Sequence, residues 1–96
     1  MAVGVILEFE RATLDQYDQV LEKMGFSPGS GGAPGGLLFH WVTATDGGIR
    51  VTDVWTDRET FERFTQDRIG PHTAEVGIRS PPDISFFEVH NYVTAA

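Results

Sequence analysis

Four short apolar stretches of strand length alternate with two amphipathic stretches of helical length, and this order constrains the fold more than any other feature of the sequence. The expected strands cover residues 3–9, 37–43, 49–56 and 84–93. One helix is expected between the first and second strands, and another between the third and fourth. This order predicts the α+β class and the ferredoxin-like βαββαβ fold, a four-stranded antiparallel sheet with two helices on one face.

Local signals mark where the helices begin and where the second one ends. Thr13 with Gln16, and Thr56 with Glu59, each place a Gln or Glu three residues after a threonine. This spacing is a capping box, in which two side chains satisfy backbone N–H groups at a helix start. The Gly-Pro pair at 70–71 is expected to break the second helix, because proline lacks the N–H group that a helix interior needs, and to open a further helical turn.

Glycine marks two connections between these elements. Asp46-Gly47-Gly48 separates two strand patterns and predicts a tight hairpin, since glycine accepts a positive φ angle. Residues 27–36 read SPGSGGAPGG, a composition that cannot bury much apolar surface. We expect this stretch to be a mobile loop at the edge of a pocket.

The length of 96 residues predicts one domain, and the strand patterns predict a partner for it. Alternation along the strands places a set of apolar side chains on the sheet face opposite the helices. A monomer would leave that face in water, so a second copy packed against it, giving a homodimer, is the economical arrangement. The residues expected on this face are Leu37, Phe39, Trp41, Val54, Phe87 and Val89.

Charge and cysteine content exclude several classes of protein. Fourteen acidic residues against seven basic ones give a net charge of −7, and the basic residues are scattered singly. Nucleic acid and anionic membrane surfaces bind clustered Lys and Arg, so neither is an expected partner. The absence of cysteine excludes disulfides and thiolate chemistry and fits a reducing compartment. Residues 1–9 lack the pattern of a signal peptide or a membrane span, so the expected location is cytoplasmic.

Polar residues inside the apolar strand patterns point to a pocket. His40, Asp53, Trp55 and His90 each lie in a stretch that otherwise predicts an apolar strand. If the hairpin loop has an even number of residues, His40 shares a sheet face with Asp53 and Trp55. We assign this face, which also carries Leu38, to the helix side of the sheet.

The last strand and the helices add further residues to this set. Alternation places Phe86 and His90 on one face of the last strand. We assign that face to the helix side, because it would bring a second imidazole into the same cavity. Tyr17 on the first helix and His72 in the further helical turn complete the set. For His72, a solvent-facing position at a helix cap is the alternative.

In an enzyme, these residues would carry out proton transfer. His40 would act as the base, Asp53 would orient its imidazole, and His90 would be a second acid or hydrogen-bond donor. The alternative for His40 and Asp53 is a buried hydrogen-bonded pair with a structural role only. The residues expected to bind substrate are Trp55, Tyr17, Leu38, Phe86 and His72.

A metal site is a further alternative, because two histidines and a carboxylate are a known ligand set for iron or zinc. The ligands would be His40 and His90, which lie on separate strands, and either Asp53 or Glu88. No local spacing typical of metal motifs supports such a site, so we expect no metal. No nucleotide-binding glycine motif is present either, which argues against flavin, and the expectation is that no cofactor is needed.

Three features of the sequence carry a resemblance to a known family: the element order, the apolar outer sheet face, and the stretch VTDVWTDRETFERF, in which a strand tryptophan is followed directly by a capped helix. In these features the chain resembles the dimeric α+β barrel superfamily, especially its small antibiotic-biosynthesis-monooxygenase-like proteins. The resemblance covers the whole chain. It implies a ligand cavity between the sheet and its own helices, with Trp55 in the cavity wall. Proteins of this kind include cofactor-free oxygenases, haem-degrading enzymes, isomerases and cyclases. Trp55 and His72 are farther apart here than the corresponding pair in the haem-degrading branch, which argues against haem.

These observations together predict a homodimeric, cytoplasmic α+β barrel with a pocket for a small apolar or aromatic ligand. The expected function is a cofactor-independent enzyme of the oxygenase, cyclase or isomerase type. The alternative is a non-catalytic ligand-binding or stress-response dimer in which the same residues only pack. The fold by itself does not choose between these two classes.

Overall fold

The computed structural model describes residues 1–26 and 34–95. Most of the glycine-rich stretch predicted to be a mobile loop lies outside the described residues, so its mobility stays a prediction. The helices and strands, in chain order, are β1 Val3–Glu10, α1 Leu14–Met24, β2 Leu37–Thr45, β3 Gly48–Trp55, α2 Arg58–Phe64, the π-helical turn η1 Thr65–Ile69, α3 Gly70–Glu75 and β4 Asp83–Glu88.

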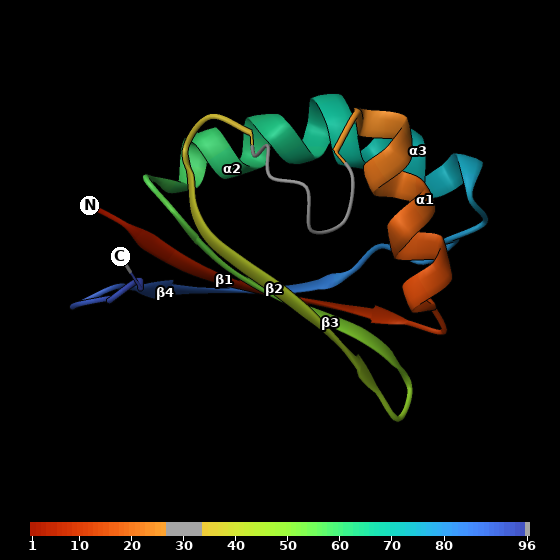
Figure 1. The fold of residues 1–96 in the computed structure, drawn as a ribbon, viewed down its shortest axis with the longest axis horizontal. Coiled ribbons are helices and arrows are strands. Elements are labelled where there is room, and N and C mark those ends of the chain that lie inside the picture. The colour runs from red at the N-terminus through yellow and green to blue at the C-terminus, as the bar shows by residue number, and fades with distance from the viewer. Residues whose placement is uncertain (27–33, 96) are drawn as a thin grey trace.

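A four-stranded sheet with the strand order β2-β3-β1-β4 forms the base of the fold. Each neighbouring pair of strands is antiparallel. The helices α1, α2 and α3 lie on one face of this sheet, and no helix of the described residues covers the other face (Figure 1). The structure therefore confirms the predicted ferredoxin-like α+β fold.

The first helix begins where the sequence predicts and ends at a glycine. The Gln16 backbone N–H donates to Thr13 Oγ1 over 3.1 Å, and the Thr13 backbone N–H donates to Gln16 Oε1 over 3.0 Å, which completes the predicted capping box. Gly25 ends the helix with a φ of 87°. This left-handed conformation is one that glycine adopts without steric cost, so α1 stops at a defined residue.

The second helix begins one residue later than predicted. The cap of α2 is Asp57, whose Oδ1 accepts a 2.7 Å hydrogen bond from the Thr60 backbone N–H. The predicted capping box of Thr56 and Glu59 is therefore wrong. Asp57 caps a helix at least as well as a threonine does, and its negative charge is favourable at a helix N-terminus.

The Gly70-Pro71 pair does not break the second helix. Helical structure runs without interruption through α2, η1 and α3. In η1 the Gly70 backbone N–H donates to the Thr65 carbonyl five residues earlier. A wider turn of this kind relieves the clash between a proline ring and the preceding carbonyl groups, which accounts for the π-helical turn directly before Pro71.

The core lies between the sheet and the helices. Alternate residues of β1 and β3 face the helices, so Val5, Val51 and Trp55 are buried. Phe61 of α2 packs its ring edge against the Trp55 indole, with 5.6 Å between the ring centroids. The alternation that predicted Trp55 on the helix side of the sheet therefore holds along β3, and β1 alternates in the same way.

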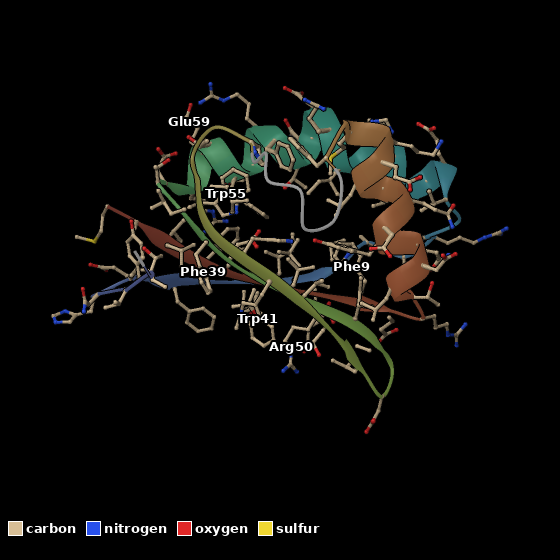
Figure 2. The ribbon with its side chains drawn as sticks, in the orientation of Figure 1. Phe9, Phe39, Trp41, Arg50, Trp55 and Glu59 are labelled. Carbon is tan, nitrogen blue, oxygen red and sulfur yellow. The ribbon has the colours of Figure 1, made fainter. Side chains whose placement is uncertain are left out.

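Apolar side chains also lie on the sheet face that no helix covers. Phe39, Trp41 and Phe87 have 42%, 48% and 54% of their surface exposed. Figure 2 shows Trp41 and Arg50 on the side of the sheet away from the helices. Arg50 pairs with Glu8 at the hairpin end of this face. The chain therefore presents a mainly apolar sheet surface with an ion pair at one end.

An irregularity near the start of β2 exchanges two predicted positions. Leu37 pairs with Trp55, whereas Phe39 pairs with Val54, so Leu38 is an extra residue in the ladder. An extra residue in one strand shifts the alternation of side chains by one position. Leu37 therefore lies on the helix side and not on the outer face, and the prediction that Leu38 lies on the helix side is wrong.

The last strand is shorter than predicted. β4 ends at Glu88, which pairs with Val3 at the start of β1. The Val89 backbone N–H still donates to the Ala2 carbonyl, but the residues that follow have no neighbouring strand in the described part of the chain. A strand needs a hydrogen-bonding partner, so the apolar pattern up to residue 93 is not sufficient to extend β4.

The β2–β3 hairpin has a two-residue loop, because Thr45 pairs directly with Gly48. The loop length is even, as the assignment of His40 and Asp53 to one face required. Neither Gly47 nor Gly48 has a left-handed φ angle, so the expected reason for glycine here is wrong. Gly48 is needed for another reason: a Cβ atom at this position would lie 1.9 Å from the Phe9 carbonyl oxygen.

We predict that Gly48→Ala lowers the free energy of unfolding by about 2 kcal/mol, because a new Cβ would push β1 away from β3. Urea unfolding followed by circular dichroism measures this change. Gly47→Ala is the matched control, since a Cβ at Gly47 has no atom within 4 Å. Equal stability of the two variants would contradict the close approach of Phe9.

Candidate functional site

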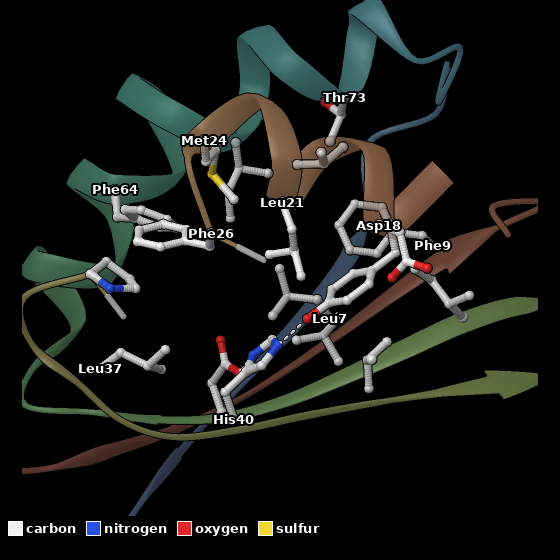
Figure 3. A pocket seen from close by; sticks show the side chains of 18 of the residues that line it. Leu7, Phe9, Asp18, Leu21, Met24, Phe26, Leu37, His40, Phe64 and Thr73 are labelled. Atoms are coloured by element: carbon white, nitrogen blue, oxygen red, sulfur yellow. Dashed lines mark hydrogen bonds and ion pairs between the residues drawn. The ribbon is translucent and has the colours of Figure 1, made fainter. Parts of the chain in front are cut away.

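A cavity of about 410 Å³ lies between the helix side of the sheet and the helices (Figure 3). This volume is within the range of pockets that hold small organic ligands. Most of the wall is apolar. The apolar residues that line it are Leu7, Phe9, Val20, Leu21, Met24, Phe26, Pro34, Leu37, Val42, Ile49, Val51, Trp55, Phe64, Ile69 and Ile78. The polar residues that line it are Tyr17, Asp18, His40, Asp53 and Thr73.

His40 and Asp53 lie directly opposite each other on β2 and β3. His40 Nδ1 and Asp53 Oδ1 are 2.6 Å apart, a short hydrogen bond of the charge-assisted kind. Asp53 is 6% exposed, whereas the His40 side chain is 31% exposed. The Asp53 carboxylate is thus buried on the helix side of the sheet, and the partly exposed His40 imidazole lies beside it in the cavity wall.

Trp55 supplies the second hydrogen bond to the Asp53 carboxylate. The Trp55 Nε1–H group donates to Asp53 Oδ2 over 3.0 Å. Both side chains belong to β3 and are two residues apart, so they lie on the same face of the strand. Indole can only donate, so this contact fixes one carboxylate oxygen as an acceptor and leaves the other oxygen for His40.

Tyr17 joins the same hydrogen-bonded chain from α1. Its Oη atom is hydrogen-bonded to His40 Nε2 (Figure 3). Since Asp53 accepts from the Nδ1–H group, the Nε2 atom of a neutral His40 carries the lone pair and accepts from the Tyr17 hydroxyl. The hydrogen-bonded chain therefore runs from Tyr17 through His40 to Asp53, with Trp55 on the far oxygen of the carboxylate.

Burial raises the pKa of Tyr17 to about 12, and the negative charges of Asp53 and Asp18 add to this effect. Both causes disfavour the phenolate. Tyr17 is thus a neutral phenol at ordinary pH and takes part in hydrogen bonds as a hydroxyl group. The arrangement makes the imidazole, and not the tyrosine, the group that can accept a proton.

Four of the eight predicted site residues lie outside the cavity. Leu38 is the extra residue of the β2 irregularity and is 38% exposed. Phe86 does face the helices, but it packs against Phe61 at a centroid distance of 5.6 Å and belongs to the core. His90 is exposed beyond the end of β4, because that strand is too short to reach it. These three predictions of a position in the pocket are wrong.

His72 is the fourth predicted residue that does not line the cavity. It lies on α3, and its Nδ1 atom is 3.1 Å from Glu75 Oε1 on the same helix. Hydrogen bonds from Lys23 and His72 lower the pKa of Glu75. His72 therefore has no part in the described cavity wall, and it is a half-buried residue of α3 and not the solvent-facing cap of the alternative.

Sequence reasoning missed several residues that line the cavity. Leu21 and Met24 follow Tyr17 at helical spacings of four and three residues, and the face of α1 that they share lines the cavity. Asp18 follows Tyr17 directly and gave no signal, because a charged residue on a surface helix is ordinary. Leu37 was placed on the other face, since an extra residue in a strand leaves no mark in the pattern of alternation.

Two kinds of group are missing from the described part of the cavity wall, a lysine or arginine side chain and a metal-binding cluster. Among the described residues, no Lys or Arg lines the cavity. Across residues 1–26 and 34–95, no three His, Cys, Asp or Glu side chains lie together in a way that could hold a metal ion. No helix in the described part of the chain is both long enough and apolar enough to cross a membrane.

The fold is similar to that of solved enzymes. No protein-family model matches the chain, and no curated protein matches it with significance. The crystal structure of SnoaB, a cofactor-independent oxygenase from Streptomyces nogalater, has a TM-score of 0.59 and 17% identity over 98% of this chain and 97% of the other. A mutant of SnoaB has a TM-score of 0.56 at the same identity and coverage.

A third solved structure is less similar in fold. It is a monooxygenase from the gene ActVA-Orf6 of Streptomyces coelicolor, in complex with nanaomycin D, with a TM-score of 0.47 and 19% identity over 99% of this chain and 92% of the other. The chain has the ferredoxin-like α+β fold of SnoaB, the type of fold that the sequence resemblance implied.

We predict that Asp53→Asn reverses the tautomer of His40 without removing the side chain. Trp55 can only donate, so the new amide must turn its oxygen to the indole and its NH₂ group to His40 Nδ1. His40 would then carry its proton on Nε2. Ring ¹⁵N chemical shifts of His40 measure the tautomer in both proteins. An unchanged Nδ1–H tautomer in the variant would contradict this geometry.

Proposed function

We propose that the chain is a cofactor-independent enzyme that removes a proton from an uncharged apolar or aromatic small molecule. The observation that carries this proposal is a hydrogen-bonded chain of Tyr17, His40 and Asp53, with Tyr17 and His40 in the wall of an apolar cavity. A base that is oriented by a carboxylate and adjoins a ligand-sized cavity is the arrangement that general base catalysis needs.

The proton would leave the substrate through Tyr17. A substrate hydroxyl or an activated C–H group donates its proton to Tyr17 Oη, while the Tyr17 hydroxyl proton moves to His40 Nε2. The substrate becomes an anion and His40 becomes an imidazolium. Tyr17 is a neutral phenol before and after the transfer, in agreement with its raised pKa.

Asp53 would stabilise the charge that forms on His40. The carboxylate lies 2.6 Å from Nδ1 in a buried setting, where the attraction between opposite charges is stronger than in water. Trp55 is a positioning residue in this scheme, because its Nε1–H group holds Asp53 Oδ2 and so orients the carboxylate. His40 would be the catalytic base and Tyr17 the group that relays the proton.

The composition of the cavity wall favours an uncharged ligand. Apolar side chains form most of it, and the described residues that line it include two aspartates but no Lys or Arg. A carboxylated or phosphorylated substrate would lose its hydration there without gaining a cationic partner. A neutral aromatic molecule with a hydroxyl or carbonyl group satisfies both the apolar wall and the polar groups.

The fate of the anion decides the type of reaction. It can react with dioxygen, attack a carbonyl carbon of the same molecule, or accept a proton at another carbon, which gives an oxygenase, a cyclase or an isomerase. The similarity in fold to SnoaB, a cofactor-independent oxygenase, supports the first of these. The absence of cysteine fits a reducing compartment, and we place the enzyme in the cytoplasm.

We predict that His40→Gln lowers kcat by about 10²- to 10⁴-fold on a neutral bicyclic or tricyclic phenol that the protein turns over, with a small change in KM. Oxygen uptake and product mass, measured without added metal or flavin, report the reaction. His90→Gln is the matched control, because this histidine is exposed and outside the cavity.

Two outcomes would contradict the proposed function. One is equal activity of the His40→Gln and His90→Gln variants, which would remove His40 as the base. The other is tight binding of neutral phenols and ketones with no change in any of them, with or without dioxygen. That result would favour the alternative, a ligand-binding protein without catalysis.

We further propose that the enzyme is a homodimer formed through the uncovered sheet face. Phe39, Trp41 and Phe87 on this face are each exposed by about half, and Val54 lies between them in the sheet. A second copy is the occupant we propose, because the apolar centre complements itself across a two-fold axis and the Arg50–Glu8 pair lies at its edge.

We predict that Trp41→Glu shifts the protein from dimer to monomer, because a carboxylate would be buried without a partner at the interface. Light scattering at micromolar concentration measures the mass. Leu14→Glu is the control, since Leu14 is 43% exposed on α1 and distant from this face. A parent protein with the mass of one chain would contradict the dimer directly.

A further inference from the structure

We infer that Tyr17 is a hydrogen-bond switch whose direction is set by the proton on His40, so that the cavity prefers ligands that donate hydrogen bonds when His40 is neutral and ligands that accept them when His40 is charged. This inference rests on one part of the proposed function, the binding of an uncharged aromatic ligand in the cavity. It goes further because it assigns a ligand preference to each protonation state of the site.

The two rings meet in a geometry that makes such a switch possible. The planes of Tyr17 and His40 differ by only 12°, and their centroids are 5.9 Å apart. The hydroxyl oxygen contacts Nε2 at the edge of the imidazole ring. Because the Nε2 lone pair, or the N–H bond that replaces it, lies in the ring plane, the same position serves for a hydrogen bond in either direction.

With a neutral His40, the tyrosine donates to the histidine. Asp53 accepts from the Nδ1–H group, which leaves a lone pair on Nε2 for the Tyr17 hydroxyl hydrogen. The hydroxyl oxygen then has free lone pairs and no free hydrogen. Towards the cavity, Tyr17 is therefore an acceptor, and it suits a ligand with an O–H or N–H group.

With a protonated His40, the direction reverses. Nδ1–H still donates to Asp53, but Nε2 now carries a hydrogen that donates to the Tyr17 oxygen. The Tyr17 hydroxyl hydrogen is free to turn into the cavity. Towards the cavity, Tyr17 is then a donor, and it suits a carbonyl oxygen or an oxyanion.

The ionisable groups near the Tyr17–His40 pair leave the Tyr17 hydroxyl protonated. Two carboxylates face it among the described residues, Asp53 from β3 and Asp18 beside Tyr17 on α1. Both disfavour a Tyr17 phenolate, and the pKa of Tyr17 is raised to about 12, so its hydroxyl keeps its hydrogen throughout the range in which histidine titrates. The Tyr17 hydroxyl hydrogen is therefore present in both protonation states of His40.

The switch matches the order of events in a proton-transfer reaction. Before transfer, Tyr17 accepts a hydrogen bond from the acidic group of the substrate. After transfer, His40 holds the proton and Tyr17 donates to the anion that has formed. The same hydroxyl thus binds the substrate and stabilises the anion, without any movement of α1 relative to β2.

The test uses three bicyclic probes of similar size. Indole can only donate a hydrogen bond, 2-tetralone can only accept one, and naphthalene can do neither. NMR of the ring signals follows the titration of His40, and calorimetry gives the dissociation constants of the probes on its two sides. As the pH falls through this titration, we expect indole to bind about fivefold more weakly and 2-tetralone about fivefold more tightly, with naphthalene unchanged.

Variants assign the effect to the proposed atoms. Tyr17→Phe should remove the opposite pH dependences and leave all three probes bound, because the ring stays and the hydroxyl goes. Asp18→Asn should keep both dependences, which excludes titration of Asp18 as their source. Equal pH dependence of indole and 2-tetralone in the parent protein would overturn the switch. If none of the probes binds at any pH, the proposed ligand class fails together with the switch.

Discussion

The buried Asp53 carboxylate is the group on which the rest of the site depends. A carboxylate this far from water is tolerated only if both oxygens have partners, and removal of one partner of a buried charge costs about 3 to 5 kcal/mol. Here the partners are the Trp55 indole from the same strand and the His40 imidazole from the next strand. Each partner donates a hydrogen bond to this charge. His40 must therefore carry a hydrogen on Nδ1, so its tautomer follows from the burial of Asp53.

The register of the β2–β3 hairpin makes this arrangement possible. A loop of two residues pairs Thr45 with Gly48 and brings His40 opposite Asp53. A shift by one residue would turn the imidazole to the outer face and leave the carboxylate without its partner. The close packing of Gly48 against the Phe9 carbonyl, which fixes the hairpin end on β1, thus also maintains the geometry of the site.

The sequence predicts the fold and the central pair, but not the limits of the site. The alternation of side chains between the two faces of a strand was sufficient to place His40 and Asp53 on one face, because this alternation continues unchanged along regular strands. It failed at Leu38, where an extra residue changes the phase, and at His90, where the neighbouring strand ends first. The contact of Tyr17 with His40 depends on how α1 packs over β2, and periodicity within a helix carries no information on that.

Deuterium exchange at the acidic C–H group of 2-tetralone, followed by NMR in D₂O under argon, tests the central claim most directly. Proton removal alone is measured, whatever reaction the natural substrate undergoes afterwards. The account predicts that the protein accelerates the exchange by at least about a hundredfold over buffer and that His40→Gln abolishes the acceleration. Exchange at the buffer rate, with 2-tetralone demonstrably bound in the cavity, would contradict the assignment of His40 as a base.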